Sequence, residues 1–209
     1  QACGVVPIDV KKMNIDFLSC GSHKWLMGTE GCGFIYINKD YLEDLKPQTA
    51  GWLSHENGLG FLFDGPGHLK YNRPLQKTPS VFENGAMNAI GFAALEAGVD
   101  AILTLGVSTI YDHVQQYNDR LEDTLCELGY QSHRSVDSSF HSGILSFSHP
   151  NRVFTMAFVQ LLEKKKLSCT TPDGYLRFSP HWPNSLDELP LIQSIFESLD
   201  DEESPTATT

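Results

Sequence analysis

The chain has 209 residues, 41% of them hydrophobic, and a formal net charge of −11 at pH 7. This length suits one large domain or two small ones, and the hydrophobic share is ordinary for a globular protein. The acidic balance argues against nucleic acid or an anionic membrane as a partner, because both need clustered Lys and Arg side chains.

The ends of the chain and its cysteines carry little further signal. Gln1 to Gly4 show no basic segment followed by an apolar one, so no signal peptide is expected. No apolar run approaches the ~18 residues of a membrane span. The five cysteines are odd in number and none has C-x-x-C spacing, which predicts neither a disulfide framework nor a metal site. Reduced thiols of this kind are typical of cytoplasmic proteins.

Strand and helix patterns alternate from the start of the chain. Short apolar runs bounded by glycine predict buried strands at 15–20 and 34–37, and a helix is predicted from 39 to 45, before Pro47. Residues 46–85 are rich in Gly, Pro, Asn and Asp. They predict a long irregular segment, which in a compact domain is usually functional or disordered.

Two helices are predicted next, at 87–103 and 107–128. The first has four alanines that would form a thin face for close packing: Ala93, Ala94, Ala97 and Ala101. The second has apolar residues at helical spacing, and Gly129 fits its end.

The last third of the chain is again mixed. We expect two strands and two helices there, at 143–147, 175–179, 153–162 and 186–199. In the second strand Leu176 and Phe178 share one face and Arg177 points to the other. Ser185 and Glu188 have capping-box spacing at the start of the last helix. The alternation as a whole predicts an α/β fold.

The most informative segment surrounds Lys24, which lies between two predicted strands and beside Trp25 and Leu26. Lysine is rarely buried unless it is paired or does chemistry. Apolar surroundings disfavour the ammonium form, so the free amine becomes available as a nucleophile toward an aldehyde. Taken alone, however, a lysine beside a tryptophan is more often a surface residue whose stem covers apolar surface.

The segment reads His23-Lys24-Trp25-Leu26-x-Gly28-x-x-Gly31-x-Gly33-Phe34-x-Tyr36. This string resembles the cofactor-lysine signature of the class V aminotransferases, a pyridoxal 5'-phosphate-dependent family of fold type I that includes cysteine desulfurases and isopenicillin N epimerase-like proteins. The resemblance implies that Lys24 is catalytic, as the Schiff-base lysine and proton shuttle. It implies that His23 binds the cofactor phosphate and that Gln1 bonds the cofactor's phenolic oxygen.

A second segment reads Phe82-Glu83-Asn84-Gly85-Ala86-Met87-Asn88. It is similar to the family's F-E-x-G-T-x-N, which in the family reaches across a dimer to the neighbouring cofactor. The resemblance therefore implies a homodimer in which backbone N–H groups at Gly85 and Ala86 bind the cofactor phosphate near a helix N-terminus. Ala86 replaces the expected threonine, and a plain helix start is the alternative.

A third segment reads Gly174-Tyr175-Leu176-Arg177-Phe178-Ser179-Pro180-His181-Trp182-Pro183-Asn184. It is similar to the family's G-x-L-R-x-S-x-H-x-Y-N, whose arginine binds the substrate carboxylate. Arg177 is thus implied as the substrate-binding residue, and a guanidinium does pair with a carboxylate bidentately. An exposed strand arginine is the alternative.

The resemblance runs from Gln1 to about Leu199 and implies the architecture. Residues 1–103 would be the C-terminal part of a three-layer αβα large domain, 104–199 a small α+β C-terminal domain, and 200–209 a disordered acidic tail. The family's Asp that pairs with the pyridine nitrogen would precede Gln1. We therefore expect a fragment that is inactive alone, with the missing N-terminal half of the same protein as a partner.

The resemblance implies an enzyme acting on an amino acid, of aminotransferase, epimerase or lyase type. One alternative is a non-catalytic truncated relative. Another is an enzyme like cysteine desulfurase or selenocysteine lyase, which would need a nucleophilic cysteine on a loop. Residues 164–171 show no such loop, and Cys169 is predicted to lie in a strand. An unrelated α/β binding domain would require the motif matches to be coincidental.

Overall fold

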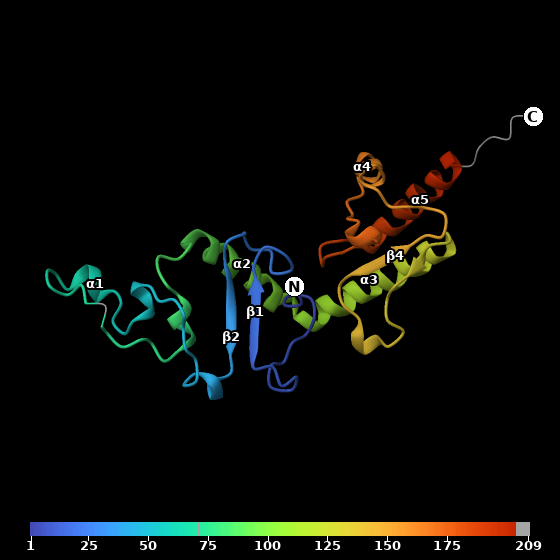
Figure 1. Cartoon of the computed structure of the whole chain (residues 1–209). Helices are drawn as coiled ribbons and strands as arrows, with labels where there is room; N and C mark the ends of the chain where they lie inside the picture. The colour runs from blue at the N-terminus through green and yellow to red at the C-terminus, as the bar shows by residue number, and fades with distance from the viewer. Residues whose placement is uncertain (71, 204–209) are drawn as a thin grey trace, which may run out of the picture. The chain divides into compact units, whose positions relative to one another are not determined.

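The computed structural model describes residues 1–70 and 72–203, and of residues 200–203 only the backbone. It has mixed α/β content and divides into two compact units (Figure 1). Unit 1 is Gln1 with Ile8–Thr104, and unit 2 is Ala2–Pro7 with Leu105–Thr209. A division into units does not show that either folds alone, so the domains assigned from the sequence stay predictions.

Unit 1 is built on an antiparallel pair of strands, β1 (Phe17–Gly21) and β2 (Gly33–Ile37). The prediction that these strands are buried is wrong for much of their surface, since Phe17 is 55% and Ile35 45% exposed. The reason is that the described residues give this sheet two strands, and the close contacts of α2 (Ala89–Leu105) are with the connection between those strands. The three-layer αβα arrangement is therefore only partly present.

Helix α2 packs through a different face from the one we predicted. Its buried residues are Gly91, Leu95 and Ile102. Ala93, Ala97 and Ala101, expected to make the close contact, are exposed. Glycine allows a closer approach of two backbones than alanine does, and the glycines of this helix, not its alanines, face the rest of unit 1.

The rest of unit 1 has little regular structure. The predicted helix at 39–45 is only a 3-10 turn, η1 (Lys39–Tyr41). The irregular segment from 46 to 85 contains three short turns, η2 (Trp52–Ser54), α1 (Gly60–Phe63) and η3 (Pro79–Phe82). It is bonded to itself by a bridge between His55 and Leu75.

Unit 2 combines helices with a three-stranded antiparallel sheet in the order β3-β4-β5. Its elements are α3 (Val107–Glu127), β3 (Gln131–Ser132), η4 (Ser138–Phe140), β4 (Leu145–Ser148), α4 (Met156–Lys164), η5 (Pro172–Gly174), β5 (Leu176–Phe178), η6 (Leu186–Glu188) and α5 (Leu189–Glu203). Strand β3 was not predicted, because two residues are too few to show a periodic pattern.

The core of unit 2 lies between its helices and its sheet. Its fully buried side chains include Leu121 and Leu125 of α3, Phe147 of β4, Leu176 of β5 and Phe196 of α5. These residues follow the 3.6-residue spacing on the helices and alternate on the strands, which confirms the periodicity predicted for α3 and β5.

The end of α5 departs from the prediction. The helix continues to Glu203, so residues 200–203, expected in a disordered tail, are helical. The remainder of that predicted tail, 204–209, lies outside the described residues. No single described helix is both long and apolar enough to cross a membrane; α2 and α3 reach that threshold only as a pair.

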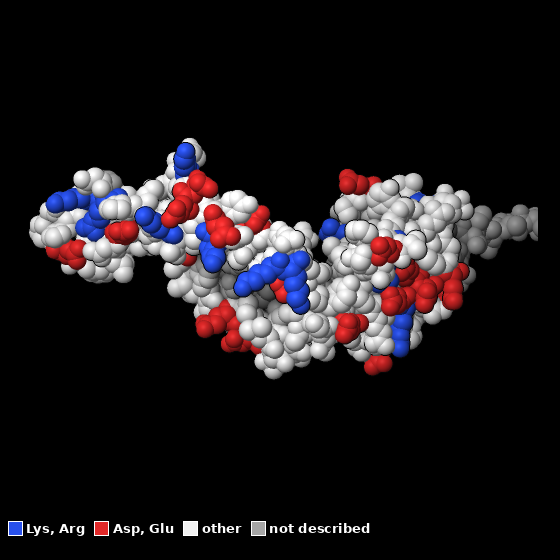
Figure 2. Space-filling view, turned by 90° about the horizontal axis from the view of Figure 1, so that it is seen from below, with Lys and Arg blue, Asp and Glu red and all other residues white. Residues whose placement is uncertain are grey.

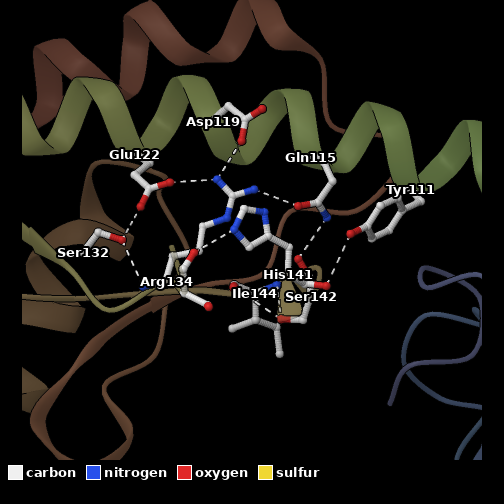
Figure 3. Close-up of polar contacts among 10 residues, drawn as sticks. Tyr111, Gln115, Asp119, Glu122, Ser132, Arg134, His141, Ser142 and Ile144 are labelled. Carbon is white, nitrogen blue, oxygen red and sulfur yellow. Dashed lines mark hydrogen bonds and ion pairs between the residues drawn. The ribbon is translucent and has the colours of Figure 1, made fainter. Parts of the chain in front are cut away.

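A polar cluster fastens the segment after α3 to that helix (Figure 3). The Arg134 guanidinium is only 7% exposed and donates to Asp119 at 2.6 Å and to Glu122 at 2.7 Å. It also donates to Gln115 at 2.7 Å, and Gln115 in turn donates to the Ser142 carbonyl at 3.0 Å. The cluster therefore ties both ends of the 134–142 connection to one face of α3.

Acidic side chains predominate on the part of unit 2 visible in Figure 2, in keeping with the net charge of −11. In the described part of the chain no group of three or more His, Cys, Asp or Glu side chains is placed to hold a metal ion.

Candidate functional site

Lys24 lies on the connection between β1 and β2. His23 and Lys24 are exposed, in agreement with the surface position expected for a lysine beside a tryptophan, while the next two residues, Trp25 and Leu26, are buried at 6% and 5% exposure. The apolar neighbours thus point into unit 1 and leave the lysine in solvent. No described residue forms an ion pair or a side-chain hydrogen bond with the Lys24 amine, so the amine is accessible to a reagent.

The connection is folded tightly on itself around Ser22, which is fully buried. The Ser22 N–H donates to the Cys32 carbonyl at 3.1 Å, and the Gly28 N–H donates to the Ser22 carbonyl at 2.9 Å. The Ser22 hydroxyl donates to the Thr29 carbonyl. Met27 takes a left-handed conformation, with φ 56°, which lets the chain turn back so that these bonds can form.

Close contacts hold the connection on α2. A Cβ atom at Gly98 would lie 2.2 Å from the Leu26 carbonyl oxygen. The Cys32 thiol donates to the Gly91 carbonyl at 3.3 Å and lies 2.9 Å from the Ser22 hydroxyl. The backbone that carries His23 and Lys24 is therefore fixed to a helix, while both side chains remain free to meet a ligand.

The two consecutive side chains suit an aldehyde that also carries a phosphate. An accessible primary amine can react with an aldehyde. The imidazole of His23, whose ring lies against the backbone of Gly21, can donate a hydrogen bond to an anion. These residues thus fit pyridoxal phosphate at its aldehyde and its phosphate, the two groups that the sequence motif assigns to them.

Gly85 and Ala86 lie in an irregular stretch before α2. Helix α2 begins at Ala89 and is capped by Asn88, whose Oδ1 accepts from the Gly91 N–H at 2.9 Å, so the two residues lie near the helix N-terminus but outside its first turn. Their stretch passes over Gly51, where a Cβ atom would lie 1.8 Å from the Asn84 carbonyl. Cofactor binding by Gly85 and Ala86 stays a prediction.

A groove of about 970 Å³ lies beside this stretch. It is lined by Phe82, Glu83 and Met87 together with residues of β1 and β2 such as Cys20 and Phe34. Neither His23 nor Lys24 is among its lining residues. The groove therefore brings the second sequence motif against the strands, but not against the lysine.

Gln1 and Arg177 complete the predicted set. Gln1 is exposed and groups with unit 1. Arg177 is half-buried in unit 2, on the face of β5 opposite the buried Leu176 and Phe178, as the sequence predicts. Its Nε donates to the Thr170 hydroxyl at 3.0 Å, and no carboxylate among the described residues pairs with it. The guanidinium end is thus available to a carboxylate.

Cys169 has the properties of a packed thiol. It lies just before the bridge between Thr170 and Arg177, not within a strand as predicted, and packs against the core of unit 2. Burial, with a smaller effect of the Glu163 charge, raises its thiol pKa to about 11. The thiolate is the nucleophilic form, so this environment opposes a catalytic role at neutral pH.

Sequence reasoning missed the contacts that fix the site. Ser22 and Cys32 carried no signal, because their roles depend on the approach of α2 from far along the chain. The polar residues around Arg134 could have been found, since Gln115, Asp119 and Glu122 recur at helical spacing on the polar side of α3.

Comparison with known proteins gives a consistent family match. The family model described as Aminotransferase class-V matches residues 1–174. The protein named "Uncharacterized aminotransferase YcbU" of Bacillus subtilis (strain 168) is 29% identical over 189 residues, which are 90% of this chain and 47% of that protein. A probable cysteine desulfurase of Pyrococcus abyssi (strain GE5 / Orsay) is 28% identical over 95% of this chain and 50% of its own length.

A solved structure shares the fold. The apo structure of a cysteine desulfurase from Thermococcus onnurineus NA1 superposes with a TM-score of 0.82 and 25% identity, over 97% of this chain and 51% of that one. A cystine C-S lyase, C-DES, superposes with a TM-score of 0.81 at 22% identity, which shows the fold alone. This chain spans about half the length of the curated relatives it matches.

Proposed function

The chain belongs to the aminotransferase class-V family, and from this premise we propose that it carries the cofactor lysine of a pyridoxal-phosphate-dependent enzyme acting on an amino acid. The supporting observation is Lys24: an accessible amine beside an accessible imidazole, on a backbone fixed to α2. When bound, pyridoxal phosphate supplies the electron sink for chemistry at the α-carbon of an amino acid.

In this proposal the chain's own residues bind, orient and move a proton. Lys24 would hold the cofactor at its aldehyde group, and its amine would move a proton at the substrate α-carbon. His23 donates to the cofactor phosphate. Arg177 holds the substrate carboxylate, because a guanidinium forms two parallel hydrogen bonds with it and thereby fixes its orientation. The reaction is of aminotransferase, epimerase or lyase type.

Cysteine desulfuration is the second candidate, and two relatives named above favour it by their descriptions. It requires a thiolate as the sulfur acceptor. The raised pKa of Cys169 argues against that residue in this role. A third possibility is a chain that folds but does not catalyse.

The architecture and partners belong to the same proposal. Unit 1 would be the C-terminal part of the large domain of a pyridoxal-phosphate transferase, and unit 2 a small α+β domain. The family model ends at Gly174, so the assignment of the rest of unit 2 rests on the superposition and on the match to the Pyrococcus abyssi relative over 95% of this chain. A homodimer, the N-terminal half of the same protein as partner, and a cytoplasmic location are parts of the proposal too.

The test is to trap the cofactor on the lysine. The purified chain is incubated with pyridoxal phosphate, reduced with borohydride, digested and mapped by mass spectrometry. We expect dominant labelling at Lys24, its loss in Lys24→Ala, and no change in Lys39→Ala, which removes another exposed lysine. Equal labelling of all surface lysines would refute a formed cofactor site.

Activity is tested separately. The chain is combined with the separately expressed N-terminal half of the same protein, and turnover of amino acids is followed in the presence of the cofactor. Turnover that requires both halves and is lost in Lys24→Ala supports the enzyme. Clean labelling at Lys24 without turnover by the combined halves would favour the non-catalytic chain.

A further inference from the structure

Unit 2 contains a cavity of about 390 Å³ between α3, α5 and the chain on either side of β5. Its walls are mixed: the apolar part includes Leu121, Phe178, Leu191 and Ile195, and the polar part includes Tyr117, Asn184 and Glu188. Arg177 is not among its lining residues, since its side chain is on the other face of β5 from Phe178. The cavity is therefore distinct from the proposed carboxylate site, and its size is that of a small-molecule site with both polar and apolar walls.

One carboxylate, that of Glu188, faces this cavity. Its Oε2 accepts from the Asn184 side-chain amide at 3.1 Å and from the Tyr117 hydroxyl at 3.4 Å, and its Oε1 accepts from the Ser185 N–H at 3.2 Å. All three donors are neutral, and within the described residues no cation forms an ion pair with Glu188. A carboxylate has about four acceptor positions, so room remains for one more donor.

Burial and the charge of Glu188 both affect the pKa of the neighbouring Tyr117 hydroxyl. Tyr117 is 4% exposed, and burial, together with the charge of Glu188, raises its pKa well above the ordinary value. Tyr117 therefore stays a neutral donor through the physiological pH range. Lys166 also lines the cavity but is exposed, so its charge is screened by water more than that of Glu188.

We propose that this cavity binds a small primary amine with a branched apolar tail, as its ammonium form. The ammonium donates to the half-buried Glu188 carboxylate, which otherwise has only neutral partners; a charge-assisted hydrogen bond is the stronger kind. The tail contacts Leu191, which is 61% exposed and whose apolar surface it removes from water, and it packs beside the buried Ile192 and Ile195. The site is independent of Lys24 and of the proposed cofactor.

The probe is isopentylamine, titrated into the isotope-labelled full chain and followed by amide chemical shifts, with isopentanol as the neutral analogue. We expect saturable shifts at the residues lining the cavity with the amine, and much weaker binding of the alcohol. Glu188→Gln keeps the capping interaction with Ser185, because Gln also serves at that position. It should weaken amine binding about tenfold or more, as loss of a charged hydrogen bond implies.

The matched control is Asp187→Asn. It removes one negative charge from the adjacent residue, which is exposed and does not line the cavity, and should leave amine binding unchanged. Ser168→Trp, at an exposed position on the cavity wall, should block binding without touching Glu188. Equal binding of amine and alcohol, equal binding by Glu188→Gln, or shifts that never saturate would overturn the proposal.

Discussion

Gly98 of α2 lies directly against the carbonyl oxygen of Leu26, two residues after Lys24 in the chain. A Cβ atom at position 98 would come within 2.2 Å of that oxygen. Real Cβ atoms do not approach oxygen so closely. The β1–β2 connection that carries Lys24 can therefore pack against α2 only because position 98 has no side chain.

Gly98→Ala should therefore destabilise the chain and loosen the Lys24 connection. Alanine is favoured over glycine in a helix by about 1 kcal/mol, but forced overpacking costs about 1–3 kcal/mol. We expect a net loss in the free energy of unfolding, measured in urea, and less selective cofactor labelling at Lys24. A more stable Gly98→Ala variant would mean that the helix does not press on Leu26.

Asn88→Ala should remove the cap of α2, the helix on which the site is seated. Loss of an N-cap side chain costs about 1 kcal/mol. Asn88→Asp is the matched control, since its carboxylate can accept the same Gly91 N–H bond and is favoured at a helix N-terminus. Urea denaturation should rank the Ala variant below both the parent and the Asp variant; an Ala variant as stable as the parent would contradict the capping role.

Arg134→Met should destabilise unit 2. It leaves Glu122, which is 25% exposed on its side chain, and Gln115 without their guanidinium partner, and such losses cost roughly 1–3 kcal/mol each when the group is buried. Arg120→Met, at an exposed position of the same helix, is the control and should change stability little. Comparable losses in the two variants would show that the cluster in Figure 3 adds nothing beyond surface charge.

The thiol of Cys169 should react slowly near neutral pH. Its pKa is raised to about 11, so the thiolate is scarce at pH 8. Iodoacetamide labelling followed by mass spectrometry should modify the exposed Cys126 first, and the rate at Cys169 should keep rising toward pH 11. Rapid labelling of Cys169 at pH 7 would contradict this prediction and would support a nucleophilic role for Cys169.

The same shift predicts a pH dependence of stability. A thiol with a folded pKa of about 11 and an ordinary value of 9.0 holds its proton more tightly when folded. The stabilisation is complete below pH 9 and is lost as the pH rises toward 11. Cys169→Ser, which does not titrate there, should lose less stability than the parent between these pH values; identical pH profiles would count against the buried thiol.

The spacing of apolar residues in the sequence correctly predicted which sides of α3 and β5 in unit 2 are buried. The 3.6-residue spacing of α3 predicted its buried side, and the alternation in β5 placed Leu176 and Phe178 together and Arg177 apart. These features depend on the geometry of a single element, which successive side chains already reveal. The motif around Lys24 likewise identified the family, which the family model supports over residues 1–174.

Burial was decided by tertiary structure. An apolar run at β1 and β2 does not say how many layers cover a sheet, so the exposure of these strands was not predictable. On α2 the sequence offered both alanines and glycines, and the packing of Leu26 and Cys32 selected the glycine face. The sequence by itself determined the family and the main helices and strands of unit 2. The fold alone determined which side chains face solvent, because burial depends on residues distant in the chain.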